Sequence, residues 1–235
     1  MVGFLKPIID FIFPARCLVC GRIVAGQDGL CSECFLGVRF IGRPRCRFCG
    51  RAFEYGGPVI CGACLRVKPK FDRNISVMEY GDAARSIILA FKHGDKTSIA
   101  RFMARLMLAA GGELVSACDA IVPVPIHFYR LVKRKYNQAG LVAQIIGRKA
   151  GRPVFHYALL RSRATESQGH KSAAARLDNV RGAFKVRKGA VSAVAGKKIL
   201  LIDDVFTTGA TLAECVRALK RAGAKRVYCL TFAKA

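Results

Sequence analysis

The stretch from Lys198 to Leu212, KILLIDDVFTTGATL, constrains the fold of this chain more than any other segment. Its four apolar residues, Ile199 to Ile202, predict a buried parallel strand, because such strands are covered on both faces. A loop of small residues follows, and the apolar spacing from Ala210 to about Ala222 predicts an amphipathic helix. The stretch therefore indicates an α/β domain in which helices cover a mostly parallel sheet.

The loop and the end of this strand suit a phosphorylated sugar. The loop consists of five small residues: Thr207, Thr208, Gly209, Ala210 and Thr211. Their hydroxyls and backbone N–H groups stand at a helix N-terminus, which favours a phosphate. Asp203 and Asp204 stand at the carboxyl end of the strand and suit ribose hydroxyls and a Mg²⁺ ion that joins them to a second phosphate. A strand–turn–helix unit with ordinary capping Thr residues is the alternative.

Length and composition are those of a globular protein with a sizeable core. The chain has 235 residues and is 52% hydrophobic, enough for one substantial domain and a small one. Its formal net charge is +25, and residues 120–200 include 17 Lys or Arg against only Glu166 and Asp178. One small phosphorylated ligand employs few of these cations. A nucleic-acid surface is one explanation for the others, and a solvated basic face is the alternative.

No stretch predicts a membrane-spanning helix. The most apolar ones, 102–114 and 190–202, are short or interrupted by charged residues. The N-terminal segment MVGFLKPIIDFIFPARC contains Asp10 and leads directly into a cysteine motif, without the small-residue cleavage site of an export signal. We therefore expect a cytoplasmic protein whose N-terminus forms a short amphipathic helix packed on the domain. Attachment of that helix to a membrane surface is the alternative.

Eight of the eleven cysteines form four CxxC pairs within the first 64 residues. The pairs are separated by ten, eleven and eleven residues: Cys17/Cys20, Cys31/Cys34, Cys46/Cys49 and Cys61/Cys64. Two pairs complete a tetrahedral Cys₄ site, so the pattern predicts a double zinc ribbon with two structural zinc ions. We expect sequential pairing, although the spacing also permits an interleaved one. Disulfides are the alternative, and the missing export signal argues against them.

The zinc-ribbon segment is rich in arginine and aromatic residues. Five arginines are interleaved with four aromatic residues: Arg39, Arg43, Arg45, Arg47 and Arg51 with Phe40, Phe48, Phe53 and Tyr55. Such a surface binds single-stranded nucleic acid through phosphate contacts and base stacking. A solvated rim over a small core is the alternative. The other cysteines, Cys118, Cys215 and Cys229, each lie alone in an apolar segment and are predicted to fill the core.

The remainder of the chain alternates between strand and helix patterns. We expect strands at 75–80, 120–124, 154–161, 183–186 and 226–233, and helices at 82–92, 98–116 and 138–149. The basic segment 126–137 is predicted to be a loop. The alternation implies parallel strands with right-handed crossovers, a Rossmann-like core. We place a zinc-ribbon domain at 1–68 and the α/β domain at 72–235, with a linker near 66–71.

The motif at 199–211 resembles the phosphoribosyl pyrophosphate (PRPP) motif of type I phosphoribosyltransferases. Two further segments, VPVPIHFYRLVKRKYNQA and LLRSRATESQGHKSAAARLDNVRGAF, together with the CxxC pairs, make almost the whole chain similar to the ComF family. The resemblance implies a type I phosphoribosyltransferase sheet that binds PRPP with Mg²⁺. It also implies handling of single-stranded DNA in natural transformation, with a competence helicase or other DNA-processing proteins as partners.

The same resemblance assigns roles to individual residues. Asp203 and Asp204 position the ribose, while residues 207–211 hold the 5-phosphate. Arg130, Arg134 and Lys135 are expected to bind pyrophosphate. Arg163 and Lys171, on a loop that closes over such sites, are expected to act in catalysis. A lysine at the position of Lys92 is also typical of the family.

The phosphoribosyl acceptor stays open. Thr207 stands where hypoxanthine-type enzymes have an Asp general base, so that residue is not available to deprotonate a purine ring. Three hypotheses follow. The chain is a PRPP-binding protein that handles transforming DNA, a metabolic phosphoribosyltransferase stabilised by zinc, or a non-catalytic protein that senses PRPP or binds DNA on an enzyme scaffold.

Overall fold

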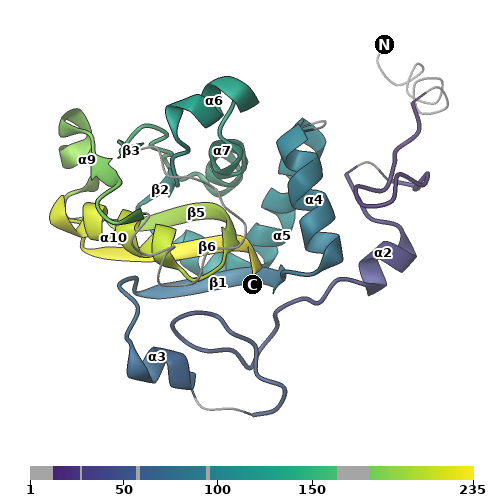
Figure 1. Ribbon diagram of the computed structural model, residues 1–235, viewed down its shortest axis with the longest axis horizontal. Helices are drawn as coiled ribbons and strands as arrows, with labels where there is room; N and C mark the ends of the chain where they lie inside the picture. The colour runs from purple at the N-terminus through teal and green to yellow at the C-terminus, as the bar shows by residue number, and fades with distance from the viewer. Residues whose placement is uncertain (1–12, 27, 57–58, 94–95, 163–179) are drawn as a thin grey trace.

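A four-stranded parallel sheet forms the centre of the molecule. The computed structural model describes residues 13–26, 28–56, 59–93, 96–162 and 180–235, so the expected N-terminal helix lies outside the described residues. The strand order is β1 (Arg73–Glu79), β6 (Arg226–Lys234), β5 (Lys198–Phe206) and β2 (Ala120–Pro123). Each neighbouring pair is parallel, as predicted (Figure 1). The carboxyl ends of the four strands therefore share one edge of the sheet.

Both faces of the sheet are covered because the side chains of β5 alternate between two cores. Leu200 and Ile202 pack with α4 (Asp82–His93), α5 (Lys96–Ala117) and α7 (Gln138–Ala150). Ile199 and Leu201 pack on the opposite face with α10 (Ala210–Arg221) and α9 (Val191–Val194), which follows a single turn, η1 (Lys188–Ala190). Cys118, Cys215 and Cys229 are buried in these cores, which confirms their predicted role. Among the described residues, none forms a helix long and apolar enough to cross a bilayer.

Two segments differ from the predicted secondary structure. The expected strand at 154–161 is reduced to β3 (Leu159–Arg161), which pairs with β4 (Phe184–Val186) in an antiparallel hairpin outside the main sheet. Val154 makes only one bridge, to Ile121, because the chain turns away at residues 156–157. The predicted loop at 126–137 contains the helix α6 (Phe128–Arg134). Its sequence, FYRLVKR, has no Gly or Pro, and the His127 ring caps the helix by accepting from Tyr129 N.

The chain between the two cysteine clusters lies along the open edge of β1, and the first ribbon lies beyond it, next to α4 and α5 (Figure 1). Backbone hydrogen bonds run from Ile41 N to Val77 O at 2.9 Å and from Glu79 N to Arg39 O at 2.8 Å. These contacts cover an edge strand that would otherwise expose unpaired backbone groups. The short helices α2 (Ser32–Leu36) and α3 (Gly62–Arg66) belong to the first and second ribbon, respectively.

The second ribbon is attached to the sheet by a buried asparagine. The amide Nδ2 of Asn74 donates to Cys49 O at 3.1 Å, and Asn74 N donates to Phe48 O at 2.6 Å. Gly50 has φ +70°, and a Cβ there would lie 2.9 Å from Asn74 O. Only a glycine allows this close approach. The first ribbon is held differently, by Asp28, whose carboxylate lies 2.5 Å from Nε of Arg101 on α5.

Candidate functional site

The predicted phosphate loop joins β5 to α10 at the carboxyl edge of the sheet. Gly209 has φ +77°, and a Cβ at this position would lie 2.9 Å from Cζ of Phe206, the last residue of β5. The loop can therefore turn over the Phe206 ring only with a glycine here. Thr207 and Thr208 are exposed, and Ala210 N donates a long bond to Thr208 Oγ1 at 3.4 Å. The loop presents hydroxyls and N–H groups at the start of a 12-residue helix.

The acidic pair stands just before this loop, next to one lysine. Asp204 N donates to Asp203 Oδ1 at 2.9 Å, and Lys92 Nζ lies 3.8 Å from Asp204 Oδ2. Burial raises the pKa of the Asp203 carboxyl well above its usual range, and the neighbouring charge of Asp204 raises it further. A second cation near this pair would favour its doubly ionised form. The arrangement thus suits a divalent metal held with ligand hydroxyls.

The segment that follows α6 contacts α4, the helix that carries Lys92 of the acidic-pair region. Lys135 adopts a left-handed conformation, φ +63°, where α6 ends. The next residue, Tyr136, donates its hydroxyl to Phe91 O, adjacent to Lys92, while Asn137 Nδ2 donates to Val124 O at 3.0 Å. Residues 135–137 are therefore fixed between the end of β2 and the helix that carries Lys92. The side chains of Arg130 and Arg134, and all of Arg163 and Lys171, lie outside the described residues.

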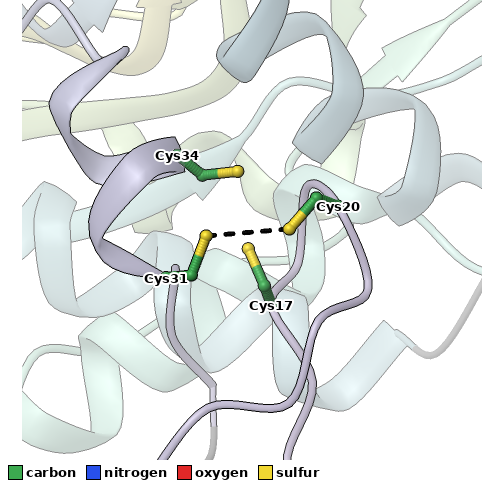
Figure 2. Close-up of side chains that lie close together, drawn as sticks. All are labelled: Cys17, Cys20, Cys31 and Cys34. Carbon is green, nitrogen blue, oxygen red and sulfur yellow. Dashed lines mark hydrogen bonds between the residues drawn. The ribbon is translucent and has the colours of Figure 1, made fainter.

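The eight CxxC cysteines form two clusters, paired sequentially as expected. Cys17, Cys20, Cys31 and Cys34 form the first cluster, and Cys46, Cys49, Cys61 and Cys64 form the second. Within each cluster the sulfur atoms all lie within 4.8 Å of one another, and Figure 2 shows the first four converging. Cys20 and Cys31 are 3.6 Å apart, and Cys49 and Cys61 are 3.7 Å apart. Two sulfur atoms that bind one tetrahedral zinc ion through Zn–S bonds of about 2.3 Å lie about 3.8 Å apart, whereas the two sulfur atoms of a disulfide lie about 2.05 Å apart.

In each cluster one cysteine is shifted toward the thiolate, while burial and the neighbouring thiols raise the pKa of Cys34 in the first cluster and of Cys64 in the second. Burial alone would raise the pKa of Cys17 and of Cys46. Nearby backbone N–H groups outweigh burial and lower these pKa values to about 6 and about 7. In the second cluster, Cys61 N donates to Cys46 Sγ at 3.3 Å. Since the thiolate is the form that binds zinc, both clusters fit the metal.

The two clusters differ in their relation to the phosphate loop. All four cysteines of the second cluster are buried in the core shared with Phe71, Phe206 and Ala210, whereas Cys20 of the first is exposed. A cavity of about 450 Å³ lies between the second cluster and residues 207–210. Lys234 lines it with its Nζ 3.7 Å from the centroid of the Phe206 ring. The second ribbon thus packs in one core with Phe206 and Ala210, the residues on either side of the loop. The sequence did not predict this contact.

Known proteins share both parts of this architecture. Residues 8–65 match the family model described as a double zinc ribbon domain, and residues 113–235 match that of a phosphoribosyl transferase domain. Competence protein F of Haemophilus influenzae is 31% identical over 231 residues, which cover 95% of this chain and 98% of that protein. The chain belongs to the competence protein F family.

Two further relatives extend the competence protein F family across other bacteria. DNA utilization protein YhgH of Escherichia coli K12 is 32% identical over 225 residues, covering 92% of this chain and 96% of that protein. Competence protein ComFC of Bacillus subtilis is 28% identical over 204 residues, covering 84% and 80%. The matches confirm the predicted fold class, a type I phosphoribosyltransferase sheet with an N-terminal double zinc ribbon, and they support structural zinc in the two clusters.

In this competence protein F homologue, the raised pKa of Asp203 leads to a stability prediction. The folded state binds the Asp203 proton more tightly than the unfolded state does. Protonated Asp203 therefore adds to the free energy of unfolding at low pH, and this contribution is lost as pH rises through the raised pKa. Asp203→Asn keeps a neutral side chain at every pH. We therefore expect the variant to melt about 2–4 °C above wild type near pH 8.5, roughly 1 kcal/mol for a chain of this size, and by a smaller margin near pH 5.

Thermal unfolding monitored by circular dichroism at the two pH values measures this effect. Asp119→Asn is the control, because this exposed carboxylate precedes β2 at the opposite edge of the sheet. An Asp203→Asn protein that is less stable than wild type at the higher pH would show that ionised Asp203 is well accommodated without ligand.

Proposed function

We propose that this protein binds PRPP together with Mg²⁺ and transfers or senses its phosphoribosyl group. One observation carries the proposal. The acidic pair and the phosphate loop follow each other at the carboxyl end of β5, so one short segment, 203–211, can hold both ends of a ribose 5-phosphate. The membership of the competence protein F family and the match to a phosphoribosyl transferase domain support it.

Each part of the site has its own task in this proposal. Residues 207–211 bind the 5-phosphate through N–H groups and hydroxyls, and this binding orients the reacting carbon. Asp203 and Asp204 accept hydrogen bonds from the ribose hydroxyls and hold the Mg²⁺ that would neutralise the pyrophosphate charge. Lys135, with Arg130 and Arg134, receives the pyrophosphate, while Arg163 and Lys171 stabilise the charge that develops as it leaves. The acceptor is not assigned.

A role with single-stranded DNA is the second candidate function. The relatives are named as competence and DNA utilization proteins. The formal net charge of +25 favours a polyanionic partner, because phosphate contacts dominate nucleic-acid affinity. We propose that the protein acts on DNA in the cytoplasm, where thiolates stay reduced and bind zinc, beside a helicase or other DNA-processing proteins. Under this proposal residues 1–68 form the zinc-ribbon domain and 72–235 the phosphoribosyltransferase domain.

Calorimetric titration with PRPP, with and without Mg²⁺, tests the proposal. We expect Mg²⁺-dependent binding and a loss of about tenfold or more in affinity for Gly209→Ala. Alanine at this φ is strained and its Cβ would meet Phe206, so the loop must shift and its N–H groups no longer lie where the phosphate binds; tenfold corresponds to about 1.4 kcal/mol. Gly189→Ala is the matched control, because a Cβ at Gly189 meets no atom within 4 Å and its φ is ordinary.

Equal PRPP affinity for wild type and Gly209→Ala would place the phosphate elsewhere. Release of pyrophosphate from PRPP with a panel of bases separates an active enzyme from a protein that only senses the ligand. Binding without release supports the sensing form, and release with one base identifies the acceptor.

A further inference from the structure

An exposed aromatic surface lies on α6 and beside β3. The side chains of Phe128, Tyr129 and Tyr157 are 67%, 74% and 72% exposed. Val132, on the same short helix as Phe128, is also exposed. Figure 1 shows α6 and β3 on the side of the molecule away from α3 of the second ribbon. Several exposed large apolar side chains in one area mark an interaction site rather than a solvated surface.

Phe128 and Tyr157 of this surface line a pocket of about 590 Å³, here called the α6–β3 pocket. Phe128, Leu131 and Tyr157 contribute apolar and aromatic surface to its walls. Lys135, Arg161 and Arg187 line it as well, and the Arg187 guanidinium lies 5.9 Å from the centroid of the Tyr157 ring. None of the described residues that line this pocket is acidic. The pocket therefore suits a ligand that is both aromatic and anionic.

Amide groups in the wall supply hydrogen-bonding capacity. Asn137 lines the pocket, and its buried Oδ1 atom has no hydrogen-bond partner among the described residues. A buried acceptor of this kind is rare unless a ligand or water satisfies it. Gln144 Oε1 lies 2.5 Å from His156 Nε2, which holds a second amide in a fixed orientation at the wall.

Two arginines of the second ribbon are engaged differently. Arg43 and Arg45, together with Arg73 of β1, all contact the single carboxylate of Glu113, at 3.5, 3.2 and 2.9 Å. Their aromatic neighbours Phe48 and Phe53 are partly buried, and among the aromatic residues there Tyr55 alone is more than four-fifths exposed. Phe35, Phe40 and Tyr55 of the ribbons are also exposed. The arginine-rich cavity there includes the carboxylate of Glu113, however, whereas no described residue that lines the α6–β3 pocket is acidic.

We propose that the α6–β3 pocket binds the bases of a single-stranded nucleic acid by stacking on Phe128 and Tyr157, with Arg161 and Arg187 contacting its phosphates. The inference rests on the DNA-binding part of the proposed function and assigns it a place. Because Lys135 and Asn137 belong to the segment that reaches α4 and Lys92, a bound strand lies beside the PRPP site.

Fluorescence anisotropy with a labelled oligothymidylate tests this placement. We expect the double variant Phe128→Ala, Tyr157→Ala to bind the oligonucleotide about tenfold or more weakly than wild type at equal salt concentration. Tyr55→Ala, which removes an equally exposed aromatic side chain from the ribbon, is expected to bind within about twofold of wild type. Phe128, Tyr157 and Tyr55 are all exposed, so none of these substitutions is expected to unfold the protein.

Titration of the same variants with PRPP separates this inference from the proposed function. We expect PRPP affinity to stay unchanged in all of them. Wild-type oligonucleotide affinity in the double variant, or a loss confined to Tyr55→Ala, would overturn the inference while leaving PRPP binding intact. A double variant that turns a dimer into a monomer in sedimentation, with DNA affinity retained, would identify the surface as a contact between two copies instead.

Discussion

Replacing Asp203 and Asp204 together with alanine is expected to lower the affinity for PRPP in the presence of Mg²⁺ by about 100-fold or more. In the proposed function the pair supplies charge-assisted hydrogen bonds to the ribose hydroxyls, each worth about 1.5–3 kcal/mol, and about 2.8 kcal/mol corresponds to 100-fold. The double variant also leaves Lys92 without the carboxylate that lies 3.8 Å from it. Isothermal titration measures the loss directly.

The control for this experiment is a carboxylate at the other end of the same sheet. Asp119 accepts from Lys198 N, the first residue of β5, at 2.8 Å. Asp119→Ala is expected to keep wild-type affinity for PRPP. The phosphate loop is intact in the double variant, so weak Mg²⁺-independent binding of ribose 5-phosphate should persist. Unchanged PRPP affinity in the double variant would remove the acidic pair from the site.

Loss of the second zinc site is expected to have the other large effect. Cys64→Ser should remove one of about two zinc ions per chain, lower the Tm by about 10 °C or more, and weaken PRPP binding. The reason lies in its position, because Cys64 is buried in the core with Phe206 and lines the cavity behind residues 207–210. A tetrathiolate zinc site would also carry negative charge toward Lys234, which lies on the Phe206 ring.

Cys20→Ser provides the matched comparison in the first cluster. Cys20 is exposed, and neither core contains a cysteine of its cluster. This variant should also lose one zinc, yet bind PRPP within about twofold of wild type. Elemental analysis, thermal unfolding and titration measure the three quantities. Equal effects of the two substitutions on PRPP affinity would contradict the separate roles, and four disulfides without metal would contradict both sites.

The elements predicted correctly have signals that are local in sequence. The apolar run of β5, the acidic pair and the small residues up to Thr211 lie within one short segment, so they fix a strand, a loop and a helix without distant contacts. The cysteine clusters were also predictable, since each CxxC pair is a unit and neighbouring pairs meet first. The expected pairing order is confirmed by the two groups of converging sulfur atoms.

Of the two segments predicted wrongly, one depends on distant contacts. Residues 154–161 have the composition of a strand, but β3 pairs with β4 across a long separation in sequence, and only Val154 reaches the main sheet. Residues 128–134 were predicted to be a loop because they are basic, but they form the helix α6. Lys234, Asn74 and Phe206 act through neighbours from other segments, so no local pattern identified them. The parallel pairing of β5 and β6 places Lys234 beside Phe206. This pairing is the one feature from which a role for Lys234 could have been predicted.

A crystal structure of the protein with PRPP and Mg²⁺ tests the central claim most directly. We expect the 5-phosphate within about 3 Å of the N–H groups at the start of α10, and the ribose hydroxyls on Asp203 and Asp204. A saturated crystal in which the ligand occupies another site, with the loop and the acidic pair empty, would contradict the claim.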